Sequence, residues 1–354
     1  MKDNKKWVIS FIAVFLIFLV GTGVLTIIID PYFHYHKPLS CLQYQIYNQR
    51  YQNDGIVKHF DYDAVITGTS MTENFKASEF NELFGVNSIK VPFSGASYKE
   101  INDNLTAAIK YNPNIKIVVR CLDYYRFLDA ADTMRYEDDF YPRYLYDSFL
   151  LNDVRYIFNK TILFRDTLGT IEYTRKGGIT TDFDAYSNWA GGYTFSKDAV
   201  DAVYVRAEKA EVITSITNEN YQNITENITQ NVTELAKEHP EIEFYFFFSP
   251  YSIYYWDELS RLGTMELYLD AEKYIIELLL KFDNIHLFSF TTEYDMICDL
   301  NNYKDSRHYS EDINSQILIW IKEGAHELTK ENYEEYCTQM REFYLNYDYD
   351  SLFN

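Results

Sequence analysis

Basic side chains are scarce in this 354-residue chain, which has 32 lysine and arginine residues against 53 aspartate and glutamate residues and a formal net charge of −21. Binding to DNA or RNA depends largely on neutralising phosphates. We therefore expect no nucleic acid among the partners of the protein. The acidic residues are dispersed along the chain rather than gathered in one block, a pattern that favours solubility.

Cysteine and histidine are also sparse and scattered. The four cysteines are Cys41, Cys121, Cys298 and Cys337. They form no Cys-x-x-Cys pair, a disulfide between any two of them stays open, and Cys121 is expected to be buried at the end of an apolar run. His34 and His36 are the only close histidine pair, whereas a metal site needs several converging ligands. No Walker A or dinucleotide-binding pattern occurs, so we expect neither a metal nor a cofactor.

One long apolar run is present, from Trp7 to Ile29, and it contains no charged residue. As a helix rising about 1.5 Å per residue, it would cross a hydrocarbon core of about 30 Å. A cleaved signal peptide is the alternative, but the run is longer than the roughly 7–15 apolar residues usual there, and no small-x-small site precedes Asp30. We predict one transmembrane helix over residues 7–29.

The flanking charges predict how this helix is oriented. Lys2, Lys5 and Lys6 precede it, whereas Lys37 is the only lysine close behind it. The positive-inside rule then places the stub of residues 1–6 in the cytoplasm and residues 30–354 outside the cell membrane.

Beyond a juxtamembrane segment at residues 30–59, short apolar runs alternate with helical patterns, which predicts a parallel sheet with crossover helices. The expected strands cover residues 64–67, 88–91, 115–119, 243–248 and 285–288. The expected helices cover residues 77–84, 98–111, 207–239, 265–282 and 311–328. Residues 124–217 lack clean periodicity and are expected to form a large insertion over the sheet. We predict one α/β domain at residues 60–330, followed by an acidic, tyrosine-rich segment at residues 331–354.

Two short motifs carry the residue types of a serine nucleophile and its base. The sequence Gly-Thr-Ser ending at Ser70 directly follows an apolar run, so Ser70 is expected on a tight strand-to-helix turn. The sequence Asp-Ser-Arg-His from Asp305 to His308 precedes the helical pattern that begins at Glu311. One turn of that loop could aim His308 at Ser70 while Asp305 fixes its tautomer.

The order of these blocks resembles the SGNH/GDSL-like hydrolase superfamily, whose first block carries the nucleophilic serine and whose last block is Asp-x-x-His. The resemblance covers roughly residues 60–125 and 240–330 in scattered blocks. It implies a flavodoxin-like three-layer sandwich with a parallel sheet, and a triad of Ser70, His308 and Asp305. It also implies an oxyanion role for Gly95, which follows the second expected strand as the corresponding glycine does in that family.

The sequence departs from that family at two places. Its first block reads Gly-Thr-Ser rather than Gly-Asp-Ser, and the Gly-x-Asn of the third block is missing, where residues 120–123 read Arg-Cys-Leu-Asp. An ionised Asp123 cannot donate a hydrogen bond. The oxyanion hole is therefore expected to rest on the amides of Ser70 and Gly95, with Asn74 or Arg120 as a third donor.

The chain is rich in aromatic residues, with 34 tyrosines and 25 phenylalanines, and amphipathic rings make good platforms for sugars. Tyr251, Tyr254 and Trp256 follow the strand at residues 243–248. We expect them, together with Asp123, to contact substrate at the carboxyl edge of the sheet; packing of these rings between the insertion and the sheet is the alternative.

A membrane anchor on such a domain is similar to proteins of cell-envelope polymer acylation, of the D-alanyl-lipoteichoic acid biosynthesis type and the alginate O-acetylation type. The resemblance implies a serine esterase or O-acyltransferase acting on acyl groups of a cell-surface polysaccharide or teichoic acid, alongside a multi-pass membrane acyltransferase. A catalytically inactive glycan-binding or scaffold protein of an envelope-modification complex is the alternative.

Overall fold

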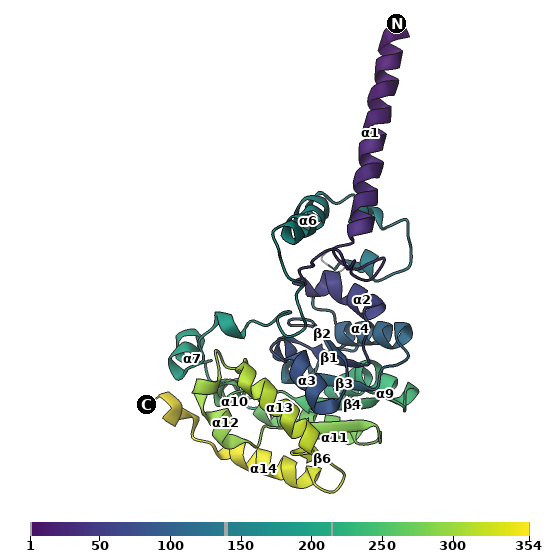
Figure 1. Cartoon of the computed structure of the whole chain (residues 1–354). Coiled ribbons are helices and arrows are strands. Elements are labelled where there is room, and N and C mark those ends of the chain that lie inside the picture. The colour runs from purple at the N-terminus through teal and green to yellow at the C-terminus, as the bar shows by residue number, and fades with distance from the viewer. Residues whose placement is uncertain (1, 138–140, 214, 354) are drawn as a thin grey trace. The chain divides into compact units, whose positions relative to one another are not determined.

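A computed structural model of the chain describes residues 2–137, 141–213 and 215–353 (Figure 1). The chain divides into two compact units. The first comprises Met1–Phe60 and Tyr136–Asp182, and the second comprises Asp61–Arg135 and Phe183–Asn354. Each unit is described separately below.

In the part of the second unit that the structure describes, six strands form one sheet in the order β2-β1-β3-β4-β5-β6. The strands are β1 (Ala64–Gly68), β2 (Ser88–Pro92), β3 (Ile117–Leu122), β4 (Glu243–Phe248), β5 (Ile285–Ser289) and β6 (Glu327–Leu328). The first five run parallel and β6 is antiparallel to β5. The predicted α/β class is confirmed, and the predicted parallel sheet is confirmed except for its antiparallel edge strand β6.

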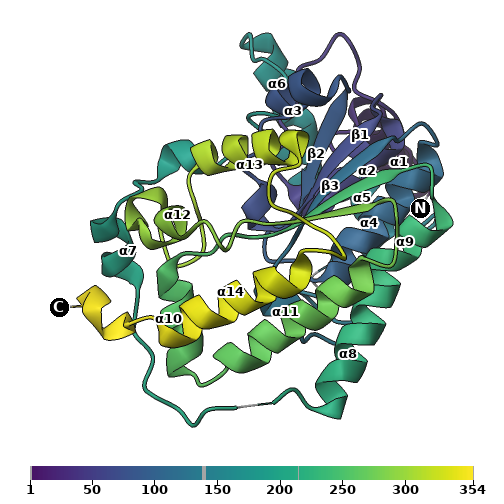
Figure 2. The ribbon, with the colours of Figure 1, turned by 90° about the horizontal axis from the view of Figure 1, so that it is seen from below.

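Helices cover both faces of this sheet (Figure 2). On one face lie α3 (Ala77–Phe84) and α13 (Glu311–Glu323). On the other lie α4 (Tyr98–Tyr111), α8 (Asn218–Ile228), α9 (Glu234–Glu238), α11 (Met265–Leu279) and α14 (Tyr333–Asn346). Shorter helices are α7 (Lys197–Val203), α10 (Ile253–Arg261) and α12 (Tyr294–Cys298). Because both faces are covered, the residues of β1 and β2 are buried throughout.

The helices expected over residues 207–239 and 311–328 have other bounds in the structure. The helix expected over 207–239 begins only at Asn218, where the side chain of Thr217 caps it in a capping box with Asn220. The helix expected over 311–328 ends at Glu323, because Gly324 adopts the left-handed conformation that stops helices. Residues 327–328 add the edge strand β6 instead.

The acidic C-terminal segment is part of the second unit's core. Its helix α14 packs on α11 and buries Tyr336, Met340 and Tyr344. The Tyr336 hydroxyl donates to Glu272 of α11. The predicted boundary at residue 330 is therefore not a boundary of the folded unit.

The first unit contains α1 (Lys2–Ile29), α2 (Gln49–His59), α5 (Val154–Ile157), the π-helical turn η5 (Ile162–Thr167) and α6 (Leu168–Arg175). Among the described residues, one helix is long and apolar enough to cross a membrane, over Asn4–Ile29. Directly after it, the buried carboxylate of Asp30 accepts hydrogen bonds from the backbone of His34, Tyr35 and His36. Residues 30–36 are therefore folded into a turn directly after α1.

The insertion expected at residues 124–217 is divided between the two units. Residues 136–182 belong to the first unit, because their side chains bind its carboxylates and hydroxyls. The Tyr156 hydroxyl donates a hydrogen bond of 2.7 Å to Asp30, and the Tyr32 hydroxyl donates one of 2.6 Å to Asp166. Contacts between residues so far apart in the chain leave no periodic signal in the sequence.

The buried Glu272 gives the second unit a pH-dependent stability. Burial raises the pKa of this carboxyl to about 7, against the opposing effect of the Tyr336 hydrogen bond. In the unfolded chain the Glu272 carboxyl loses its proton at a lower pH than in the folded chain. The free energy of unfolding therefore falls as pH rises from about 4.5 to 7. We predict a loss on the order of 2–3 kcal/mol in the free energy of unfolding over that range. Chemical denaturation of the full chain in detergent micelles measures it.

The matched variants are Glu272→Gln, which cannot ionise, and Glu331→Gln, which removes an exposed carboxylate. Glu272→Gln should lack the loss of stability between these pH values, whereas Glu331→Gln should retain it. An unchanged pH profile in Glu272→Gln would show that the carboxyl titrates normally in the fold.

Candidate active site

A tight turn after β1 presents Ser70 at the carboxyl end of the sheet. Gly68 has a φ of +147°, and a Cβ there would lie 2.7 Å from the Cys121 sulfur, so only glycine fits. Ser70 then begins a single 3₁₀ turn, Ser70–Thr72. As predicted, Cys121 is buried, and its burial leaves no room for a side chain at Gly68.

A second turn presents His308. The Asp305 carboxylate accepts hydrogen bonds from the backbone amides of Arg307 and His308, at 2.9 and 2.8 Å. Tyr303 and Tyr309 pair in an antiparallel bridge and close the loop from both sides. The Asp305 carboxylate is therefore hydrogen-bonded to the backbone of the same loop that carries His308.

The two turns bring the three predicted side chains into one hydrogen-bonded chain. The Ser70 hydroxyl oxygen lies 2.8 Å from His308 Nε2. On the other side of the ring, His308 Nδ1 lies 2.8 Å from one Asp305 carboxylate oxygen and 3.0 Å from the other. Burial opposes ionisation of Asp305, but hydrogen bonds and the charge of His308 outweigh it and lower the pKa to about 2. At neutral pH the carboxylate is ionised beside the imidazole.

Ser70 and His308 open into a cavity of about 450 Å³, which Gly95 and Tyr251 also line. Gly95 has a φ of +63° in the turn after β2. Among the residues that the structure describes, no protein group accepts a hydrogen bond from the backbone N–H of Ser70 or Gly95. Both residues line the cavity, so their amides are candidates for binding an anionic oxygen there.

The prediction of Arg120 as an oxyanion donor is wrong, whereas that of Asn74, whose side-chain nitrogen has no partner among the described residues, stays a prediction. The fully buried side chain of Arg120 donates to the carbonyls of Asn231 and Tyr98. Asn74 is buried too, and its side-chain oxygen accepts a hydrogen bond from the amide of Trp189. Neither belongs to the described lining of the cavity.

Asp123 also lies outside the described lining, so the expected substrate contact is corrected to a positioning role. Its buried carboxylate accepts hydrogen bonds from the hydroxyls of Ser249, at 3.0 Å, Tyr251, at 2.6 Å, and Thr69. Thr69 and Asp123 are the two positions at which the sequence departs from the SGNH pattern. An aspartate at position 69 would place a second carboxylate against Asp123, whereas the threonine hydroxyl donates to it.

Two predicted aromatic contacts belong to packing rather than to the cavity. Trp256 is buried and stacks on Tyr344 of α14, with ring centroids 3.9 Å apart. The Tyr254 hydroxyl donates to Asp201 on α7. Both residues lie in α10, whose buried face the sequence pattern did not identify.

Two arginines of the cavity were missed by the sequence interpretation. Arg135 lies over Gly95, and a Cβ at that glycine would be 3.2 Å from its guanidinium carbon. Arg307 also lines the cavity and forms an ion pair with Glu258 at 2.8 Å. Its place inside the Asp-Ser-Arg-His motif was a usable signal, because a residue between two triad members must lie near them.

Trp189 and Lys304 were also missed. The Trp189 ring meets the His308 ring edge-to-face at 5.5 Å, and the Lys304 ammonium lies over Trp189 at 4.2 Å. These contacts support the outer face of the histidine. Nothing near residue 189 in the sequence distinguishes this tryptophan from a core residue.

No protein-family model matches the chain, and no curated protein sequence matches it.

The hydrogen bond from Thr69 to Asp123 can be tested by removing the hydroxyl. Thr69→Val preserves shape but leaves the buried carboxylate one donor short, and we predict a loss of about 1.5–3 kcal/mol in the free energy of unfolding. Thr69→Ser keeps the donor and should lose distinctly less. Equal stability of the two variants would mean that the hydroxyl contributes nothing to Asp123.

Proposed function

We propose that the protein is a membrane-anchored serine esterase or O-acyltransferase of the SGNH type, with Ser70 as nucleophile. The observation that carries the proposal is the continuous chain of hydrogen bonds from Ser70 through His308 to Asp305. A hydroxyl becomes a nucleophile when an adjacent base takes its proton and a third group orients that base.

In the first step, the Ser70 oxygen attacks the carbonyl carbon of an acyl ester while its proton passes to His308 Nε2. Asp305 stabilises the imidazolium that forms, and the amides of Ser70 and Gly95 bind the oxygen that becomes negative. The bond to the alcohol then breaks, and His308 returns the proton to the departing oxygen. The acyl group is left on Ser70.

In the second step, water or an acceptor hydroxyl gives its proton to His308 and attacks the acyl group. The bond to Ser70 breaks, and His308 returns the proton to the serine oxygen. Water completes hydrolysis, whereas a sugar or polyol hydroxyl completes transfer.

The topology supports an active site at this place. In open α/β sheets, ligands bind outside the carboxyl ends of the strands, at the point where the strand order reverses. With the order β2-β1-β3, that point lies beside β1, and Ser70 is two residues past its end. The resemblance of the motifs to the SGNH superfamily supports the same proposal.

The surroundings of the site favour an extracytoplasmic substrate that is anionic. The lysines before α1 favour a cytoplasmic N-terminus and an exported remainder.

Arg135 and Arg307 line the cavity, whose described lining includes no carboxylate, in a chain of net charge −21. Among the cell-surface polymers considered, a phosphate-bearing teichoic acid fits two guanidinium groups better than a neutral polysaccharide does. A multi-pass membrane acyltransferase would be the donor partner for transfer.

A fluorophosphonate probe tests the nucleophile, because it reacts covalently with activated serines. The full-length protein in detergent micelles should be labelled on Ser70, and Ser70→Ala should not be labelled. Ser94→Ala is the matched control, since Ser94 lines the same cavity. Asp305→Asn should slow labelling on the order of 10⁴-fold, because the histidine loses its orienting carboxylate.

Equal labelling of wild type and Ser70→Ala would exclude Ser70 as the nucleophile. If neither protein were labelled but both bound the envelope polymer, the inactive binding or scaffold function would be favoured instead.

The two arginines can be tested with a pair of aryl esters that differ only in a phosphate group on the acyl or alcohol part. Arg307→Gln should raise KM for the anionic ester about tenfold or more, since a charge-assisted hydrogen bond contributes about 1.5–3 kcal/mol. KM for the neutral ester should stay unchanged, and Arg307→Lys should retain part of the preference. An equal change for both esters would assign Arg307 to holding the loop through Glu258.

A further inference from the structure

A run of large apolar side chains in the first unit faces outward. We call this surface the apolar collar and define it by Phe149, Leu150, Leu151, Val154, Phe158 and Phe164. Their exposed fractions range from 46% to 74%. Contiguous apolar surface of this kind on a folded protein marks a contact with a membrane or another protein.

The same segment is well anchored on its inner side. Tyr156 and Ile162 are buried and pack with Tyr32 and Leu145 in one cluster. The carboxylate of Asp153 accepts a hydrogen bond from the Tyr35 hydroxyl at 3.0 Å. The segment therefore has a packed polar and apolar inner face, and the collar is its second, outer face.

The segment packs directly against α1, the helix long enough to cross a membrane. A Cβ at Gly23 would lie 2.9 Å from a side-chain carbon of Ile157 and 3.0 Å from one of Phe158. Thr26 and Ile29, on the same side of the helix, are buried. Gly23 lies six residues before Ile29, which corresponds to about 9 Å along the helix axis. The contact is therefore made within the apolar run and not beyond it.

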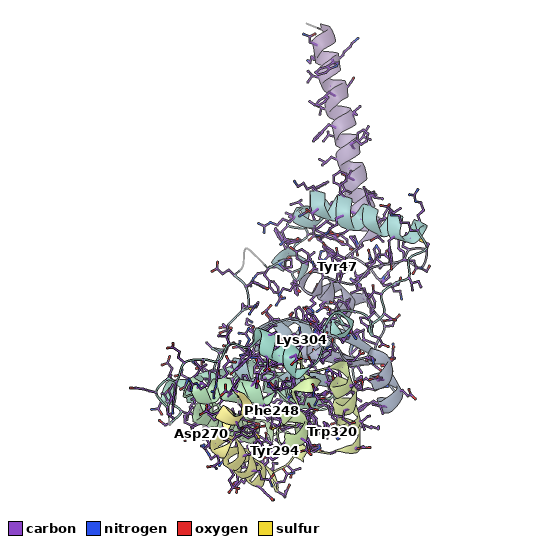
Figure 3. The ribbon with its side chains drawn as sticks, turned by 90° about the vertical axis from the view of Figure 1, so that its left-hand side faces the viewer. Tyr47, Phe248, Asp270, Tyr294, Lys304 and Trp320 are labelled. Carbon is purple, nitrogen blue, oxygen red and sulfur yellow. The ribbon has the colours of Figure 1, made fainter. Side chains whose placement is uncertain are left out.

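The helical stretch formed by η5 and α6 lies across the foot of α1 rather than alongside it (Figure 3). In Figure 1 the label α6 marks the same stretch beside the end of α1 nearer the body of its unit. A helix that crosses a membrane-spanning helix in this way runs along the membrane plane, as interfacial helices do.

The charge of this region differs from the rest of the chain. Residues 141–180 contain six lysine and arginine residues against four acidic residues, whereas the chain carries −21 overall. Arg155, Lys160 and Arg165 are exposed around the collar. Two of the acidic residues, Asp153 and Asp166, are buried. Basic side chains beside an apolar surface suit anionic lipid headgroups.

We propose that the apolar collar is immersed in the lipid of the leaflet in which α1 ends, so that the first unit is seated in the membrane interface. Lipid is the occupant because the collar segment packs on α1 at Gly23, within the apolar run, and its basic rim matches a headgroup layer. This inference does not depend on the chemistry of Ser70.

The test uses the full-length protein reconstituted in vesicles of phosphatidylcholine and phosphatidylglycerol whose acyl chains carry bromine, which quenches tryptophan on contact. Phe164→Trp and Leu150→Trp are made in a Trp7→Phe background. Vesicles of the same lipids without bromine are the control for each variant. The emission of Trp189, Trp256 and Trp320 is measured in Trp7→Phe alone and subtracted, and the unaltered protein, which keeps Trp7, reports whether α1 is in the bilayer.

The proposal expects blue-shifted emission for Phe164→Trp and Leu150→Trp, and loss of their fluorescence in brominated vesicles but not in vesicles without bromine. Quenching of Trp7 without quenching of the two collar variants would overturn it. So would unquenched Trp7, since the collar cannot lie in lipid if α1 does not.

A second measurement separates lipid from a protein partner. A benzoylphenylalanine placed at Leu151 in intact cells should form adducts with lipid on irradiation. Adducts with a membrane protein alone would assign the collar to a protein interface and contradict the proposal.

Discussion

The buried carboxylate of Asp123 is the interaction on which the candidate site depends. It follows β3 and accepts hydrogen bonds from Thr69, after β1, and from Ser249 and Tyr251, after β4. A buried charge is tolerated only when hydrogen bonds replace its hydration. The carboxylate of Asp123 thereby joins the ends of β1, β3 and β4. The residue after Thr69 is Ser70, the proposed nucleophile. The fixed position of Ser70 is thus a consequence of satisfying Asp123.

The proposed base, His308, is held by contacts within its own loop. Asp305 binds both the amide and the ring of His308, so the loop carries a preformed histidine–carboxylate pair to the sheet edge. Ser70 and His308 are 238 residues apart in the chain, yet each is held by contacts of its own turn. Such independent positioning provides the preorganisation that acyl transfer requires. It also explains why Arg307, held between them, reaches the cavity.

The sequence predicted the sheet, the serine turn and the Asp-x-x-His loop because each leaves a local pattern. It did not predict features that depend on the direction of a side chain or on contacts between residues far apart in the chain. Arg120 lies in a strand buried on both faces, so no alternation of polarity shows which face its side chain takes. Trp256 lies in a helix whose packing against Tyr344 comes from the far C-terminus. Residues 136–182 join the first unit through pairs such as Asp30 and Tyr156, which no periodicity reveals.

The central claim is that Ser70 carries the acyl group between donor and acceptor. Its most direct test is to mix the full-length protein with an activated acetyl ester, quench with acid and locate the acetyl group by peptide mass spectrometry. The account predicts an acetyl group on Ser70 in the wild type and none there in His308→Ala. Acetylation confined to lysines or the N-terminus, with no difference between the two proteins, would contradict it.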